Sequence, residues 1–361
     1  MNHTPLSAPV RLISSRRDNT ATNKTHPPVM IMKRLLLLGL AFSAATLLPG
    51  CGNKADQAAP ETSQKRLHLA FVANSPGEYW SIVNLGCSIA AQQSGAVDVD
   101  FRYPAEPTVE AQQQILNDLI AAGVDGIAIS PIDAEKQTEF LNQIAAKTLL
   151  ICADSDAGKS KRVSYIGTDN VAAGRQAADL IKEALPAGGK IALFVGYAQA
   201  QNTMDRIQGI RAGLAGSSIE IVATMEDGQK STVAGQNTRA ALAKHSDLAG
   251  VVGISGYHGP ELLRALRDAG QVGKVKIVCF DDNSDTLAGI VAGEIHGTIA
   301  QKPFHIGKQT VVHLSQSLRS NQKPAPGTNL FIESRALTKT NIEHYIAQQR
   351  NISFYLKDKN P

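Results

Sequence analysis

From Arg66 onward, short apolar runs alternate with stretches of helical periodicity, and this alternation limits the chain to few folds. The run Leu67–Val72 predicts a buried strand, and residues 79–92 carry apolar side chains at the spacing of one helical face. The same pattern repeats as far as a strand at residues 148–152. Short strands separated by helices pair in parallel and are covered on both faces, so we expect an α/β lobe.

A second series of the same kind begins near Asp169 and reaches a strand at residues 276–280. Two series predict two doubly wound parallel-sheet lobes with a cleft between them. In open parallel sheets, ligands bind beyond the carboxyl ends of the strands, because the loops and helix N-termini there present unpaired donors. The segments that follow predicted strands are therefore candidates for the site: Asn74–Trp80, Ala153–Asp156, Ser255–His258 and Asp281–Asn283.

Residues 1–50 have the features of an export leader. Lys33 and Arg34 precede the uncharged run Leu35–Leu48, which is the order of a secretory signal, and the run is too short to cross a bilayer. It ends in an LPGC sequence that resembles the lipobox of bacterial lipoproteins, in which the cysteine, here Cys51, becomes the lipidated N-terminus. A plain secretory signal with an incidental cysteine is the alternative.

The basic excess of the chain lies in this leader. The formal net charge is +4, but residues 1–50 hold six basic residues and one acidic residue, which leaves 30 basic and 31 acidic residues elsewhere. With no basic stripe outside the leader, the sequence argues against a nucleic-acid partner. Residues 51–65 are polar without a hydrophobic period and predict a solvated tether. The polar stretch ahead of Lys33 leaves open a translation start at Met30 or Met32.

The sequence contains no catalytic, metal or cofactor motif. Cys87, Cys152 and Cys279 each lie in an apolar segment without CxxC spacing, which predicts buried free thiols. Gly158–Ser160 does not complete a phosphate-binding loop, because Ala153 stands where that motif requires glycine. We therefore expect no enzyme activity, no cofactor and no metal.

Polar and aromatic side chains at the strand ends suggest a carbohydrate site. Asp154 and Asp281 directly follow apolar strands, where an ionised carboxylate can accept from two neighbouring hydroxyls of one ligand. Tyr79 and Trp80 offer flat apolar faces, and sugar rings need both directed partners and such faces. For each position alone, a helix cap or a core side chain is an equal alternative. Their joint placement favours a site for a monosaccharide or a similar polar solute.

Several segments match one known family in order and spacing over about residues 67–332. The chain resembles the ribose-binding protein family of periplasmic sugar-binding proteins, the solute receptors of sugar ABC transporters. The segments that carry the resemblance are Gly123–Pro131, Ile166–Asn170 with Gly174, Phe280–Asp281 and Thr298–Gln301.

This resemblance implies the type I periplasmic binding protein fold, in which three crossovers join two lobes. The implied hinge residues are Asp169, Gln301 and Gly327. The implied parts after the tether are an N-terminal lobe at 66–167 plus 302–327, a C-terminal lobe at 168–301 plus 328–340, and a C-terminal extension at 341–361.

The resemblance also implies roles for single residues. Tyr79 and Trp80 match an aromatic pair that sandwiches the sugar ring, and Gln301 matches an amide at the hinge. Ser155 stands where ribose binders usually have arginine, and Met204 aligns with a second ligand-contacting arginine, although Arg206 is near. The complete predicted ligand-binding set is Asn74, Tyr79, Trp80, Asp154, Ser155, Met204, Arg206, Ser255, Asp281 and Gln301.

As a function, the resemblance implies capture of a sugar between the lobes and delivery to an ABC transporter permease. The protein would act as an exported monomer of the periplasm or cell envelope, held at the membrane by lipid on Cys51. The alternative is a receptor that presents its closed form to a sensor kinase or a chemoreceptor. The identity of the sugar and the choice between these partners stay open at this level.

Overall fold

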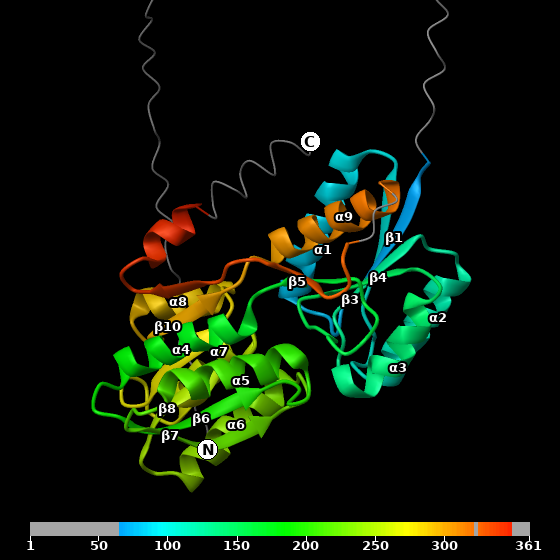
Figure 1. Ribbon diagram of the computed structural model, residues 1–361. Helices are drawn as coiled ribbons and strands as arrows, with labels where there is room; N and C mark the ends of the chain where they lie inside the picture. The colour runs from blue at the N-terminus through cyan, green and yellow to red at the C-terminus, as the bar shows by residue number, and fades with distance from the viewer. Residues whose placement is uncertain (1–64, 321–323, 349–361) are drawn as a thin grey trace, which may run out of the picture. The chain divides into compact units, whose positions relative to one another are not determined.

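The computed structural model describes residues 65–320 and 324–348 of the 361-residue chain (Figure 1). The predicted leader 1–50, Cys51 and the tether as far as residue 64 lie outside the described residues. Within residues 65–320 and 324–348, no helix combines the length and the apolar character that crossing a membrane requires.

The first lobe confirms the expected α/β architecture. Its sheet has the order β11-β5-β4-β3-β1-β2 with parallel pairing throughout. The strands are β1 (Leu67–Val72), β2 (Val97–Arg102), β3 (Gly126–Ile129), β4 (Leu149–Ala153), β5 (Ser164–Gly167) and β11 (Thr328–Phe331). One face is covered by α1 (Glu78–Ser94) and α9 (Pro303–Arg319), and the other by α2 (Val109–Ala121) and α3 (Ala134–Ala145) (Figure 1).

The second lobe repeats this arrangement with the order β12-β10-β9-β8-β6-β7, in which only β12 is antiparallel to its neighbour. The strands are β6 (Gly189–Val195), β7 (Ile219–Glu226), β8 (Leu248–Gly253), β9 (Lys276–Phe280), β10 (Gly297–Ala300) and β12 (Arg335–Thr338). One face carries α4 (Asn170–Ala184) and α5 (Gln201–Leu214), and the other α6 (Ser231–Lys244), α7 (His258–Asp268) and α8 (Ser284–Ala292).

Two glycines let α4 and α5 pack closely. A Cβ added at Gly174 would lie 2.2 Å from the carbonyl oxygen of Arg206, and one at Gly209 would lie 2.2 Å from that of Val171. Real Cβ atoms cannot approach backbone so closely, so larger residues would push the helices apart. This contact sets the position of Arg206 relative to α4.

The chain crosses between the lobes three times, as expected. Asp169 lies in the crossover from β5 to α4, and Gln301 in the crossover from β10 to α9. The prediction for Gly327 is wrong, because Gly327 precedes β11, which pairs with β5 and belongs to the first lobe. The third crossover is residues 332–334, so the lobe boundary predicted at residue 327 falls one strand too early.

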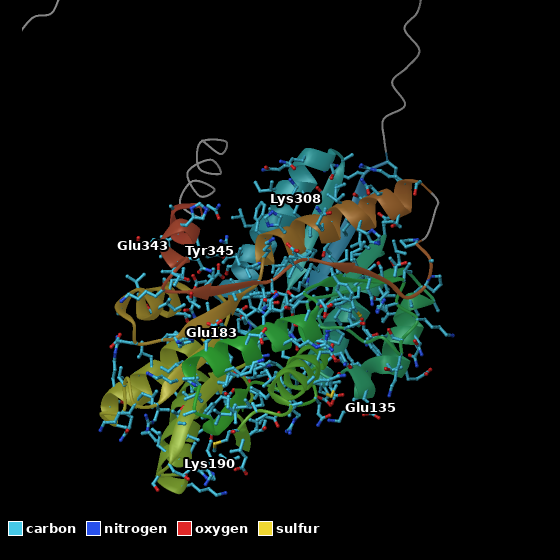
Figure 2. The ribbon with its side chains drawn as sticks, turned by 60° about the vertical axis from the view of Figure 1, so that its left-hand side comes forward. Glu135, Glu183, Lys190, Lys308, Glu343 and Tyr345 are labelled. Atoms are coloured by element: carbon cyan, nitrogen blue, oxygen red, sulfur yellow. The ribbon has the colours of Figure 1, made fainter. Side chains whose placement is uncertain are left out.

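The C-terminal extension predicted from residue 341 also needs correction. Residues 342–348 form a helical segment, and its Ile342 and Tyr345 are buried in the core of the second lobe. Tyr345 donates a hydrogen bond to Asp282. Figure 2 labels Tyr345 on this segment together with Glu343, which is exposed. The segment therefore belongs to the second lobe, and residues 349–361 lie outside the described residues.

Candidate functional site

A cavity of about 370 Å³ lies at the carboxyl ends of strands from both sheets. Residues of both lobes line it, which agrees with the expectation that loops after parallel strands form the site. Eight members of the predicted ligand-binding set line this cavity: Asn74, Tyr79, Trp80, Asp154, Arg206, Ser255, Asp281 and Gln301.

Two carboxylates occupy equivalent positions in the two lobes. Asp154 directly follows β4 and Asp281 directly follows β9, and both adopt the left-handed conformation with φ of 67° and 68°. Each backbone N–H still donates to a neighbouring strand, to Ile166 and Ile299 respectively. Left-handed non-glycine residues are uncommon and strained, and they concentrate at functional sites. The turn that ends each strand thus brings a carboxylate to the cavity.

The Asp154 carboxylate is held by neutral donors from both lobes. Tyr79 Oη donates to Oδ1 at 2.8 Å, and Ser130 Oγ donates to Oδ2 at 3.0 Å. Asn202 Nδ2 of the second lobe also donates to Oδ2, at 3.3 Å. Burial raises the pKa of Asp154, while the Arg206 charge and the first two hydrogen bonds act in the opposite direction.

Asp281 is held mainly by the crossover residue Gln301. Gln301 Nε2 donates to Asp281 Oδ1 at 2.6 Å, and Thr168 Oγ1 of another crossover donates to Gln301 Oε1 at 2.7 Å. Burial raises the pKa of Asp281 from 3.8 to about 6, although the Arg206 charge and the Gln301 bond lower it. Asp281 Oδ2 lies beside Gly256, where an added Cβ would be 3.0 Å away. The carboxylate is therefore tied to the connections between the lobes.

Arg206 supplies the cationic group of the cavity. Its Nε donates to Asn170 Oδ1 at 2.9 Å, its Nη1 donates to the Ile254 carbonyl at 2.7 Å, and its guanidinium lies 4.5 Å from the centre of the Phe280 ring. Among the described residues, its buried Nη2 has no hydrogen-bond partner. A buried unpaired donor is costly, so Nη2 is suited to a ligand oxygen.

Two predicted ligand residues lie outside the cavity lining. Met204 is 38% exposed, because residues two apart on a helix point in different directions and Arg206 of the same helix faces the cavity. Ser155 is fully buried, and its Oγ has no partner among the described residues. The prediction that Met204 contacts the ligand is therefore wrong, and Arg206 is the residue at the cavity.

The geometry does not form the predicted aromatic sandwich. The rings of Tyr79 and Trp80 are nearly perpendicular, at 85° with centroids 5.2 Å apart, so they cannot cover two opposite faces of one sugar ring. Trp80 is only 5% exposed and packs against Phe71 in the core of the first lobe. Trp80 is thus mainly a core residue that contributes part of its surface to the cavity.

The cavity also contains residues that the sequence reasoning missed. Tyr197 follows β6, Gln229 follows β7, and Asn202 lies at the start of α5. Tyr197 and Gln229, like Asp154, stand shortly after the carboxyl ends of strands, here at residues 195 and 226, so the sequence carries a signal for both. Asn202 carries no such signal, because its role depends on how the two lobes face each other.

The three cysteines of the described chain are free and buried, as predicted. Burial raises the pKa of the Cys279 thiol to about 12 and also raises the pKa of Cys87 and Cys152, so these thiols stay protonated and unreactive. Among residues 65–320 and 324–348, no three His, Cys, Asp or Glu side chains are grouped to hold a metal ion.

Comparison with known proteins gives matches in sequence and in structure. A family model described as a periplasmic binding protein domain matches residues 69–322. The ribose import binding protein of Haemophilus influenzae is 26% identical over 291 residues, which span 80% of this chain and 93% of that protein. A solute-binding protein of an ABC transporter from Burkholderia graminis, solved in complex with D-arabinose, has a TM-score of 0.73 at 29% identity. The match covers 77% of this chain and 97% of the solved chain. A chain of the solved XylFII–LytSN complex has a TM-score of 0.71 at 26% identity, and this match covers 76% of the present chain and 98% of the solved one.

Proposed function

We propose a solute-capture function from the premise that this chain belongs to the periplasmic binding protein family, among the ribose-binding-like sugar receptors of ABC transporters. Members of that group bind sugars for transport rather than transforming them, and the family implies an exported, periplasmic protein. The proposed ligand is a monosaccharide or a similar small polyhydroxylated solute, bound in the cavity and delivered to an ABC transporter permease. One copy of the chain is enough to form the proposed site, because both walls of the cavity come from a single chain.

The observation that carries this proposal is the pair of carboxylates in equivalent strand-end turns of the two lobes. Asp154 and Asp281 both line the cavity, and the unpaired Nη2 of Arg206 adds a charged donor. Such a set can accept from and donate to several hydroxyls of one small solute with charge-assisted strength. A solute that touches both lobes binds the closed form better and shifts the population towards it.

The test is a thermal-shift and calorimetry screen of the purified protein against pentoses, hexoses, polyols and nucleosides. A ligand that binds only the folded state raises stability by mass action. Stabilisation by a sugar in the wild type but not in Asp281→Ala supports the proposal and places the ligand in the cavity. Binding of a nucleoside but of no sugar retains solute capture and removes the monosaccharide assignment. No binding by any of these compounds contradicts the proposal.

Lobe closure gives a second, kinetic prediction. Tyr197 Oη of the second lobe donates to the Pro107 carbonyl of the first lobe at 2.8 Å, so this bond exists only while the lobes are together. Loss of one such bond costs about 1 kcal/mol, and Tyr197→Phe should therefore speed sugar dissociation about fivefold. Stopped-flow measurement checks this, with Tyr103→Phe as the control because Tyr103 is 51% exposed and outside the cavity. Equal dissociation rates for the wild type and Tyr197→Phe would contradict the role of this bond in closure.

We also propose that lipid on Cys51 anchors the protein to the membrane. In a bacterial host, the wild-type chain should sediment with membranes, whereas Cys51→Ser should be recovered in the soluble periplasmic fraction. The control is Cys87→Ser, which removes a buried thiol and should leave fractionation unchanged. If Cys51→Ser remains with the membranes, the anchor lies elsewhere.

A receptor that presents its closed form to a sensor kinase or chemoreceptor is the second candidate function, and it is suggested by the XylFII–LytSN complex, in which a similar protein is solved together with another protein. The two candidates differ in the partner that recognises the closed form. Sugar-loaded protein that stimulates the ATPase of a reconstituted ABC transporter supports transport. Sugar-dependent binding to the extracytoplasmic domain of a sensor kinase, without that stimulation, supports signalling.

A further inference from the structure

One buried carboxylate lies behind the cavity wall of the second lobe. Asp227 follows β7, and its side chain accepts from Tyr257 Oη, from the backbone N–H of Gln229 at 3.0 Å and from His258 Nε2 at 2.8 Å. The side chains of Asp227 and His258 are both fully buried. Asp227 therefore joins the loop between β7 and α6 to the loop between β8 and α7.

The hydrogen bonds define the tautomer of His258. The backbone N–H of Ser255 donates to His258 Nδ1 at 3.0 Å, so Nδ1 is an acceptor and carries no hydrogen. The proton of the neutral ring is then on Nε2, where it donates to Asp227 Oδ2. A continuous chain of bonds runs from the Ser255 backbone through His258 to Asp227.

The groups held by this chain of bonds line the cavity. Ser255, Tyr257 and Gln229 all belong to the lining, and Gln229 has a left-handed φ of 61°. The loop after β6 packs on the same groups, because a Cβ added at Gly196 would lie 2.9 Å from Gln229 Cγ and 3.0 Å from Tyr257 Oη. Three loops of the second lobe are thus locked to one another around Asp227.

We propose that Asp227 is a positioning residue, which holds Tyr257 and Gln229 as a rigid, selectivity-determining wall of the cavity. This inference rests on the proposed sugar-binding function. A wall with fixed donors and acceptors rejects a sugar whose hydroxyl has the wrong configuration, because a buried polar group is then left unpaired. A wall free to rearrange would bind related sugars more evenly.

The test compares substitutions that keep the hydrogen-bond pattern with substitutions that break it. In Asp227→Asn, one of the two oxygens becomes an NH2 group that cannot accept, and it would face either the Nε2–H of His258 or the backbone N–H of Gln229. His258→Leu removes both ring nitrogens and leaves the Ser255 N–H and Asp227 without these partners. The amide of His258→Gln can still accept from the Ser255 N–H and donate to Asp227. Ile290→Val is the control for stability alone, because Ile290 is fully buried in the same lobe and lies outside the cavity lining.

The measured quantity is the dissociation constant of an epimer divided by that of the preferred sugar, with the sugars drawn from ribose, arabinose, xylose, allose, glucose and galactose. We expect this ratio to fall about tenfold in Asp227→Asn and His258→Leu, in line with the loss of one buried hydrogen bond. The ratio should stay at the wild-type value in His258→Gln and Ile290→Val. Hydrogen exchange of residues 227–231 and 254–258 in the ligand-free protein should accelerate only in the first two variants.

The outcomes separate this inference from the proposed function. A wild-type protein that binds none of the sugars overturns the monosaccharide assignment and the selectivity role together. A wild-type protein that binds, with an unchanged ratio in Asp227→Asn and His258→Leu despite a lower melting temperature, overturns the selectivity role alone. If Asp227→Asn does not fold, the contrast between His258→Gln and His258→Leu decides the question.

Discussion

Replacing Asp281 by alanine is expected to weaken sugar binding about a hundredfold or more. The carboxylate is 9% exposed, faces the cavity and uses Oδ1 to accept from Gln301. Two charge-assisted hydrogen bonds to ligand hydroxyls contribute about 3 kcal/mol, and alanine also leaves the Gln301 amide without its partner. Because Gln301 lies in a crossover, the substitution should disturb both ligand contact and closure.

Calorimetric titration with the best sugar from the screen measures this loss. The matched control is Asp285→Ala, which removes a carboxylate four positions later on the exposed surface of α8 and outside the cavity. The control should bind as the wild type does, with at most a small loss of stability from the first turn of the helix. An affinity of Asp281→Ala within threefold of the wild type would exclude a direct role for this carboxylate.

Asparagine at the same position is expected to weaken binding and yet stabilise the sugar-free protein at neutral pH. Burial raises the pKa of Asp281 from 3.8 to about 6, so the folded state holds the ionised carboxylate at a cost of about 3 kcal/mol. Between these two values the folded state binds more protons than the unfolded state, and stability falls as pH rises. Asparagine carries no charge and is free of this penalty.

Urea unfolding of the wild type and Asp281→Asn across pH measures this effect. The stability gain should be about 3 kcal/mol at pH 7.5 and should shrink below about 1 kcal/mol at pH 4, where the carboxyl is almost fully protonated in the folded state and about 40% protonated in the unfolded state. Carboxyl groups remote from Asp281 titrate alike in both proteins and cancel in the difference, and the repulsion between Asp281 and the carboxylates of Asp154 and Asp282 is already part of the raised pKa of Asp281. Asp285→Asn should show no pH-dependent gain. A gain in Asp281→Asn that does not change with pH would assign the effect to packing rather than to ionisation.

Much of the candidate site was predictable because its geometry is local. Asp154 and Asp281 are each the first residue after an apolar strand, and the carboxyl ends of parallel strands meet on one edge of a sheet. The same periodicity predicted two lobes, and the family resemblance implied the positions of their first two crossovers, at Asp169 and Gln301. The prediction for Met204 was also wrong for a local reason, because residues two apart on a helix point in different directions and Arg206 is the one that faces the cavity.

Other features depended on the packed structure. β11 has only four residues, three of them exposed, so its sequence lacks the apolar run that marks the buried strands, and its partner β5 is more than 160 residues away. The network around Asp227 is equally hidden, because His258 lies 31 residues further along the chain. Apolar periodicity along the chain was therefore enough to establish the fold class and the two strand-end carboxylates, since burial of one face repeats every two or every 3.6 residues. Only the tertiary structure decided the third crossover, the core role of Trp80 and the Asp227 network, because each depends on contacts between segments whose spacing in the sequence has no period.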